Sequence, residues 1–116
     1  MDAELEDRMY RQLKGAFTVG DSCNFRIIMV PSVEYPTMEH ALTQAHGQVC
    51  FLEPTGDKFV NELSQDDLTL VVGNTEHDNL EYANRGTTWR IATPKSTDLY
   101  GINAVAIALH HWWSNR

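Results

Sequence analysis

Basic side chains gather in two groups along the chain, and phosphate binding is the chemistry that they suggest. The first group is formed by Arg8, Arg11, Lys14 and Arg26. The second group is formed by Arg85, Arg90, Lys95 and Arg116. Because polyanion affinity comes largely from neutralising phosphates with Lys and Arg, a fold that joins the two groups would create a nucleic-acid-binding face. The alternative is structural, since a helix with acids in its first turn and bases in its last complements the helix dipole.

Other residue types that could do chemistry form no recognisable site. The sequence has no Gly-x-Gly-x-x-Gly, no Walker loop and no Gly-x-Ser-x-Gly. His110 and His111 are adjacent, so on a helix they point about 100° apart and chelate one metal poorly. His77 lies in an acidic loop, where a solvated side chain is favoured over a metal ligand. Cys23 and Cys50 lie in or beside apolar stretches without a Cys-x-x-Cys pair, so we expect buried side chains and no metal centre.

The apolar pattern places these residues on alternating strands and helices. Short runs rich in β-branched and apolar residues predict strands over residues 25–30, 48–52, 68–72 and 89–92. Helical spacing predicts helices over residues 2–15, 57–63 and 98–113, and one helical turn near residues 80–83. A further helix is predicted between Thr37, as its N-cap, and Gly47.

This alternation predicts a single α/β domain over residues 1–116. We expect a small open, mostly parallel sheet of four to five strands with helices on both faces. Ligands bind such sheets beyond the carboxyl ends of the strands. That rule nominates the segments that follow the predicted strands, namely Pro31–Ser32, Glu53–Gly56, Gly73–Glu76 and Thr93–Ser96.

Charge and hydropathy limit the classes of function. The net charge of −7 argues against nonspecific nucleic-acid binding, although the acid excess concentrates in residues 57–81, where Lys58 is the only base. No apolar run approaches the roughly 20 residues of a membrane span, and the acidic N-terminus is the reverse of a signal peptide's positive start. We therefore expect a soluble, cytoplasmic protein that does not enter a membrane.

Segments in the last third of the chain resemble the SPOUT (alpha/beta-knot) RNA methyltransferases. The family pattern is an apolar strand ending in Gly-Asn/Ser-Glu, a strand ending in Arg-Ile-Pro, and Ser-Leu-Asn opening an Ala-rich helix. The similar segments here are Leu70–Asn74, Arg90–Ala92, and Gly101–Asn103 followed by the Ala-rich residues 104–109. Their order and spacing fit the family. The resemblance implies a C-terminal trefoil knot that holds S-adenosylmethionine largely through backbone groups, and a homodimer formed through the last helix.

The resemblance also implies roles for individual residues. The cofactor-binding positions would be Val72, Gly73, Asn74, Ile91, Thr93, Ile102 and Asn103. Arg11 is similar to the family's Arg that lies some six residues before a Phe, which in ribose-methylating members acts at the target hydroxyl. Arg11 and Glu76 are therefore the candidate catalytic residues, and the RNA-binding candidates are Arg8, Lys14 and Arg26.

The chain departs from the family pattern at several positions. Thr75 stands where a Glu is expected, with Glu76 after it; Ala92 and Thr93 replace the usual Pro; and Gly101 replaces the Ser. The family's first strand and its Asn-x-Gly are not seen before Arg11. Backbone contacts tolerate side-chain change, so these departures bear on catalysis more than on the cofactor pocket. The resemblance covers residues 68–113 well, 25–56 loosely and 8–17 faintly.

Other functions are compatible with the same pattern. The chain could be a non-catalytic SPOUT-like protein that binds a partner protein, or another small α/β module, flavodoxin-like or receiver-like, that binds a small ligand or a protein. A receiver would place paired acids after its first strand, and no such pair follows Val30 or Leu52. Trp112 and Trp113 are adjacent on the predicted last helix and cannot both face one core. The outer Trp favours a subunit interface, and so a homodimer.

Overall fold

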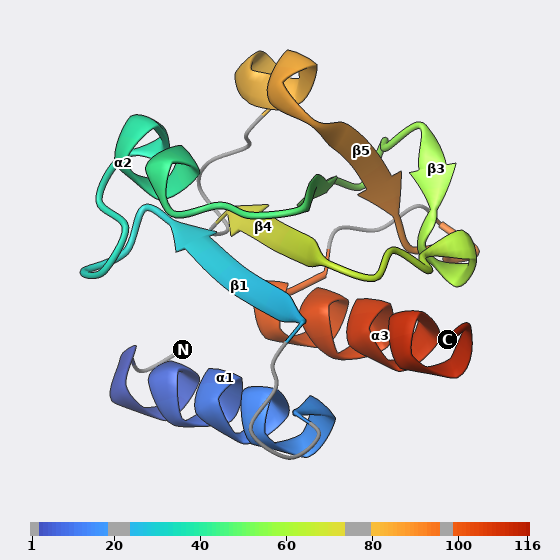
Figure 1. The fold of residues 1–116 in the computed structure, drawn as a ribbon, viewed down its shortest axis with the longest axis horizontal. Coiled ribbons are helices and arrows are strands. Elements are labelled where there is room, and N and C mark those ends of the chain that lie inside the picture. Colours follow the sequence, from blue (N-terminus) through green and yellow to red (C-terminus); the bar gives the residue numbers. More distant parts are fainter. Residues whose placement is uncertain (1–2, 19–23, 74–79, 96–98) are drawn as a thin grey trace.

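The computed structural model describes residues 3–18, 24–73, 80–95 and 99–116. Its centre is a sheet of five parallel strands in the order β1-β4-β2-β5-β3 (Figure 1). The strands are β1 (Phe25–Val30), β2 (Gln48–Leu52), β3 (Lys58–Phe59), β4 (Leu68–Gly73) and β5 (Thr87–Arg90). The expected α/β fold with a small parallel sheet is confirmed.

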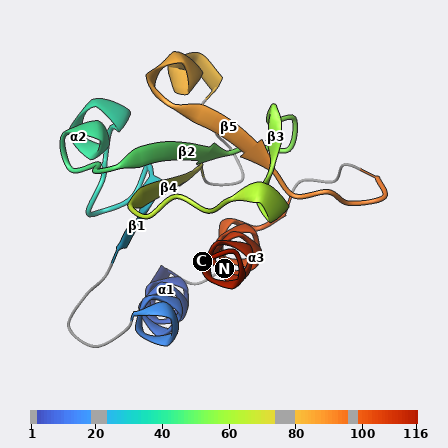
Figure 2. The ribbon, with the colours of Figure 1, turned by 45° about the vertical axis from the view of Figure 1, so that its right-hand side comes forward.

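Helices cover both faces of this sheet, as expected. The long helices α1 (Ala3–Phe17) and α3 (Gly101–Ser114) lie side by side on one face (Figures 1 and 2). The short helix α2 (Met38–Thr43) and the 3-10 helix η2 (Leu80–Arg85) lie on the other face. Because helices cover both faces of the sheet, both sides of its strands are buried. The residues of each strand therefore need not alternate between apolar and polar.

The central strand β4 supplies side chains to two cores. Leu68, Leu70 and Val72 pack into the core shared with α3, where Leu109 and Trp112 are fully buried. Val71, which points to the opposite face, packs into the core beneath α2. Successive side chains of a strand point to opposite faces, so one continuous apolar run fills both layers.

The predicted cap of α2 is confirmed. The Thr37 hydroxyl accepts a hydrogen bond from the His40 backbone N–H at 3.2 Å, and Thr37 itself has extended backbone angles. The helix predicted to stop at Gly47 ends earlier, at Thr43 with Gln44 as its C-cap. Gly47 lies beyond the helix and has a φ of 63°. A Cβ at this position would collide with the Asp67 carbonyl, so both the left-handed backbone and the close approach require glycine.

The predicted helix over residues 57–63 is wrong. Lys58 and Phe59 form β3 and pair with Trp89 and Arg90 of β5, and only Val60–Glu62 form a 3-10 turn, η1. Seven residues are too few to stabilise an isolated helix, because nucleation is unfavourable. The open edge of β5 offers the backbone partners that this segment uses instead.

Two predicted boundaries also move. The strand predicted over residues 89–92 runs from Thr87 to Arg90, because Thr87 and Thr88 pair with β2, and Ile91 follows the strand. The last helix begins at Gly101 rather than at residue 98, which lies outside the described residues. Leu99 and Tyr100 precede the helix, and Tyr100 has an extended ψ of 141°. Within the described segments, no helix is both long and apolar enough to cross a membrane.

Candidate functional site

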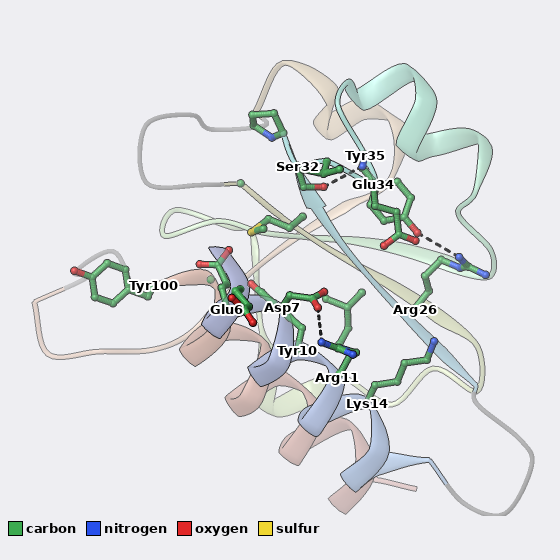
Figure 3. A pocket seen from close by; sticks show the side chains of 17 residues that line it. Glu6, Asp7, Tyr10, Arg11, Lys14, Arg26, Ser32, Glu34, Tyr35 and Tyr100 are labelled. Carbon is green, nitrogen blue, oxygen red and sulfur yellow. Dashed lines mark hydrogen bonds and ion pairs between the residues drawn. The ribbon is translucent and has the colours of Figure 1, made fainter. Parts of the chain in front are cut away.

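A groove of about 920 Å³ lies between α1 and β1 (Figure 3). One wall is the polar side of α1, and the other is β1 with the loop that follows it, residues 31–35. Gly73, at the end of β4, and Gly101, at the start of α3, also line it. The groove therefore reaches the carboxyl edge of the parallel sheet, where ligands of such folds bind.

The amphipathic pattern of α1 determines which residues face this groove. Leu13 and Phe17 pack against the core that α3 shares with the sheet. The other side of the helix carries a stripe of charged residues at intervals of three or four, and these residues line the groove: Glu4, Asp7, Arg11 and Lys14. The apolar contacts of α1 thus orient a row of charges along the cavity.

At the carboxyl edge, the end of β4 meets the start of α3. A Cβ built on Gly101 would lie 3.5 Å from Val72 Cγ2 and 2.8 Å from the Tyr10 hydroxyl oxygen. The second distance is shorter than real Cβ contacts allow, so glycine at position 101 lets α1, β4 and α3 converge. Gly73, which follows Val72 in β4, and Gly101 both line the groove.

The Tyr10 hydroxyl is buried at this convergence and has no hydrogen-bond partner among the described residues. Burial, with a smaller contribution from the negative charge of Glu6, raises the pKa of Tyr10 well above its usual range. Tyr10 is therefore a neutral phenol at physiological pH. It is suited to donate a hydrogen bond rather than to accept a proton.

The basic side chains that line the groove differ in their ion-pair and hydrogen-bond partners. Arg11 pairs with Asp7 at 2.8 Å across one helical turn, and both side chains are largely exposed. Arg26 Nη1 lies 3.4 Å from the Tyr35 hydroxyl, and Arg26 Nε is buried without a partner in the described part of the chain. Figure 3 shows Lys14 and Arg26 toward one end of the groove, and Glu6 and Tyr100 toward the other.

The structure brings together some of the residues that the sequence analysis assigned to the cofactor. Gly73 lines the groove, and Val72 and Ile102 are buried beside it, at 2% and 5% exposure. Ile91 is half-buried against the core, Thr93 is half-buried and Asn103 is exposed, and none of these three lines the groove. Asn74 lies outside the described residues.

Among the catalytic and RNA-binding candidates, some line the groove and others do not. Arg11, Lys14 and Arg26 all line the groove that contains Gly73, whereas Arg8 is exposed on α1 outside its lining. Glu76 lies outside the described residues. Of the nominated segments, Pro31–Ser32 lines the groove, but Gly56 is buried with its Cα packed against the backbone of Trp89.

Sequence reasoning missed several residues of the site. These are Tyr10, Tyr100, Glu4, Glu6, Asp7 and Glu34. The spacing of the charged residues along α1 can be read from the sequence. That this charged side of the helix faces β1 depends on tertiary packing and cannot. Gly101 was noted only as a departure from the family pattern, whereas its lack of a side chain is what admits the Tyr10 hydroxyl.

Residues that commonly bind metals do not cluster in the described part of the chain. No group of three or more His, Cys, Asp or Glu side chains there could hold a metal ion. Cys50 is fully buried, as expected, and burial raises the pKa of its thiol to about 12, so it is not a nucleophile. The chemistry of the groove rests on glycine backbone, charged side chains and the phenols of Tyr10, Tyr35 and Tyr100.

Comparison with known proteins adds no assignment to this geometry. No family model matches the chain, and no curated protein matches it significantly.

Proposed function

We propose that this protein is an S-adenosylmethionine-dependent RNA methyltransferase of the SPOUT type. The observation that carries the proposal is that Gly73 and Gly101 line one groove together with Arg11. Those two glycines belong to two of the segments that resemble the family, and they are 28 positions apart in the sequence. A cytoplasmic location goes with this proposal.

The groove has the size and backbone that such a cofactor needs. Its volume of about 920 Å³ lies within the roughly 300–1,000 Å³ typical of small-molecule sites. At the carboxyl edge, the missing side chains of Gly73 and Gly101 expose backbone groups, and backbone contacts are how the family holds this cofactor. The Tyr10 hydroxyl beside Gly101 is a buried donor in need of an acceptor.

The remaining groove residues would position the RNA nucleotide. When bound, S-adenosylmethionine supplies an activated methyl group on its sulfonium sulfur. Transfer to a hydroxyl needs in-line approach, and holding two reactants in one groove supplies that orientation. In the proposal, Arg11 lies at the target hydroxyl, where its guanidinium stabilises developing negative charge. Glu76 would accept the proton, a role that rests on the resemblance alone. Ribose 2′-O methylation is the chemistry that this arrangement favours.

Two further parts of the proposal concern the chain itself. A C-terminal trefoil knot is part of the proposal through the family resemblance. Trp113 is 54% exposed on α3 while Trp112 is 1% exposed, and Ile107 is also exposed on that helix. This apolar surface supports a homodimer through α3.

Titration calorimetry with S-adenosylmethionine tests the proposal. We expect saturable binding with one cofactor per chain. Gly73→Trp should abolish it, because the indole would fill the carboxyl end of the groove, whereas Gly15→Ala should not, since Gly15 has open space around it. Absence of binding at millimolar cofactor, in a protein shown to be folded by circular dichroism, would reject the proposal.

A non-catalytic, partner-binding relative is the second candidate. The observation that favours it is the charge of the groove, whose lining includes four acids, Glu4, Glu6, Asp7 and Glu34, against three bases. Such a balance suits a polar protein partner better than a long polyanion. Under this alternative, no cofactor binds to the wild-type protein. The calorimetric experiment therefore separates the two candidates.

A further inference from the structure

Strand β1 lies at one edge of the sheet, so some of its backbone polar groups face away from the other strands. Among the described strands it pairs only with β4, and β3, at the opposite edge, is just two residues long (Figure 1). The Leu68 N–H donates to the Asn24 carbonyl at 3.1 Å. Because the hydrogen-bonding direction alternates along a strand, Ile28 belongs to the same ladder, and the backbone groups of Ile27 and Met29 point outward.

These outward backbone groups have no hydrogen-bond partner in the described part of the chain. No described residue donates to or accepts from the outward N–H and C=O groups of Ile27 and Met29. The strand is six residues long, with the apolar sequence FRIIMV. An unpaired edge of this length and composition is a template for a further strand. The edge therefore needs a cover.

The groove follows this edge rather than one face of the sheet. Ile27 and Met29 line it, and they pack against the core shared with α3. Arg26 also lines it, and its Nη1 is 3.4 Å from the hydroxyl of Tyr35, a residue of the opposite core. The lining thus comes from both faces of β1, and the cavity lies alongside the strand, between α1 and residues 31–35 (Figure 3). A single extended chain suits such a space, whereas a second copy would bring its own α1 against these walls.

We propose that the free edge of β1 binds an extended, basic segment of a partner protein as a sixth strand of the sheet. Main-chain hydrogen bonds to Ile27 and Met29 supply the affinity, as in other cases of strand addition. The α1 wall from Glu4 to Lys14 is about 15 Å long, a distance that an extended chain crosses in about five residues. The inference is independent of the proposed methyl transfer, since it requires neither cofactor nor RNA. Where both hold, the peptide and the nucleotide compete for the space beside Arg11.

The charge and the apolar lining of the groove determine which segment suits it. The lining includes four acids against three bases, and the chain has a net charge of −7. This field attracts a basic peptide and repels an acidic one. Ile27 and Met29 present half-buried apolar side chains on the α1 side. Because side chains of an added strand alternate between the two faces, we expect apolar residues toward α1 and basic residues at the alternate positions.

Fluorescence anisotropy with a labelled heptapeptide of alternating lysine and valine tests the proposal on the full chain, without cofactor or RNA. The N–H groups of alternate residues lie on the same edge of an extended peptide. N-methylation of the valines and N-methylation of the inner lysines therefore block opposite edges. We expect saturable binding that one methylation pattern weakens about tenfold or more, through lost hydrogen bonds, while the other leaves it unchanged. The same peptide with glutamate in place of lysine should bind more weakly.

A backbone variant tests the same hydrogen bonds from the side of the protein. Ile27→Pro removes an outward N–H, and proline is tolerated on an edge strand where its nitrogen faces no neighbouring strand. Ile27→Ala is the matched control, because it shortens the side chain and keeps the N–H. The proline variant should bind the heptapeptide several-fold more weakly than the alanine variant. If the proline variant does not fold, the methylated peptides still decide.

Amide hydrogen exchange locates the bound peptide. Exchange at Ile27 and Met29 should slow several-fold on binding, while Ile28, which already pairs with β4, should be protected in both states. The proposal is overturned if the heptapeptide does not bind, if both methylation patterns or neither weaken binding, or if Ile27 and Met29 gain no protection. Protection that rises with protein concentration, without peptide, would assign the edge to a second copy of this chain instead. Because S-adenosylmethionine is absent throughout, failure here and failure of the methyltransferase proposal are separate results.

Discussion

At the scale of single residues, Tyr10 has a buried hydroxyl with no hydrogen-bond partner in the described part of the chain. A polar group left buried and unsatisfied costs about 1–3 kcal/mol. The sequence predicted α1 but not this burial, because the hydroxyl is covered only when α3 packs beside α1. The unsatisfied hydroxyl lies where the missing side chain of Gly101 leaves space for it. A bound ligand that accepts its hydrogen bond would remove this energetic cost.

Replacing Tyr10 with Phe should therefore stabilise the free protein. The substitution removes the unsatisfied hydroxyl and keeps the ring that packs against the core. We expect the free energy of unfolding, from urea titration monitored by circular dichroism, to rise by about 1 kcal/mol. In the proposed function, the same variant binds S-adenosylmethionine less tightly. A loss of stability would show that the hydroxyl has a partner that this account lacks.

Cys50 gives a second residue-scale prediction. Burial raises the pKa of its thiol from 9.0 to about 12, so the thiol stays protonated in the folded protein at pH 9. In a Cys23→Ser variant, labelling of Cys50 by a disulfide reagent at pH 9 should be slow and should accelerate in urea. Because the thiol of the unfolded chain ionises at a lower pH than the buried thiol, raising the pH from 9 to 12 lowers the free energy of unfolding that Cys50 contributes. Fast labelling without urea would contradict the burial.

At the scale of elements, the sequence predicted those whose apolar pattern is long or continuous. The strands β1 and β2 have the predicted bounds, and α1 and β4 differ from prediction by one or two residues at an end. The segment 57–63 was mistaken because Val60 and Leu63, three residues apart, suit a 3-10 turn as well as a helix. Its strand pairs with β5, and such a long-range backbone contact leaves no periodicity in the sequence.

The tryptophan pair of α3 tests how that helix is divided between core and surface. Trp112 is 1% exposed, stands edge-on to Phe25, and donates a hydrogen bond from Nε1 to the Gln65 carbonyl at 2.6 Å. Trp112→Ala should cost about 3–5 kcal/mol of stability. Trp113 is 54% exposed, so Trp113→Ala should change the stability of the monomer by less than about 0.5 kcal/mol.

Urea unfolding of the two variants at low protein concentration measures this difference. Equal losses would mean that the helix is rotated relative to the present arrangement. Sedimentation velocity at micromolar concentration adds a test of the proposed dimer, which should weaken in Trp113→Ala. A wild-type protein that sediments as a monomer would reject the dimer while leaving the stability comparison valid.

At the scale of the whole molecule, the parallel sheet with two covered faces follows from alternating apolar strands and helices, and the sequence predicted it. The strand order and the groove did not follow. Strand order depends on which strands pair over long range, and the groove depends on where α1 lies against β1. The carboxyl-edge rule, which needs only strand direction, nominated Pro31–Ser32 and Gly73, and these residues line the groove. Gly56, in another nominated segment, packs on Trp89 and does not line it.

A titration of the ¹⁵N-labelled protein with S-adenosylmethionine, followed by amide correlation spectra, tests the central claim most directly, since it reports both binding and its place. We predict saturable shifts at the amides of Gly73 and Gly101, with little change at Gly47 and Gly86, which lie outside the groove lining. No shift at millimolar cofactor, or shifts centred on Gly47 or Gly86, would contradict a cofactor site at the carboxyl end of the groove.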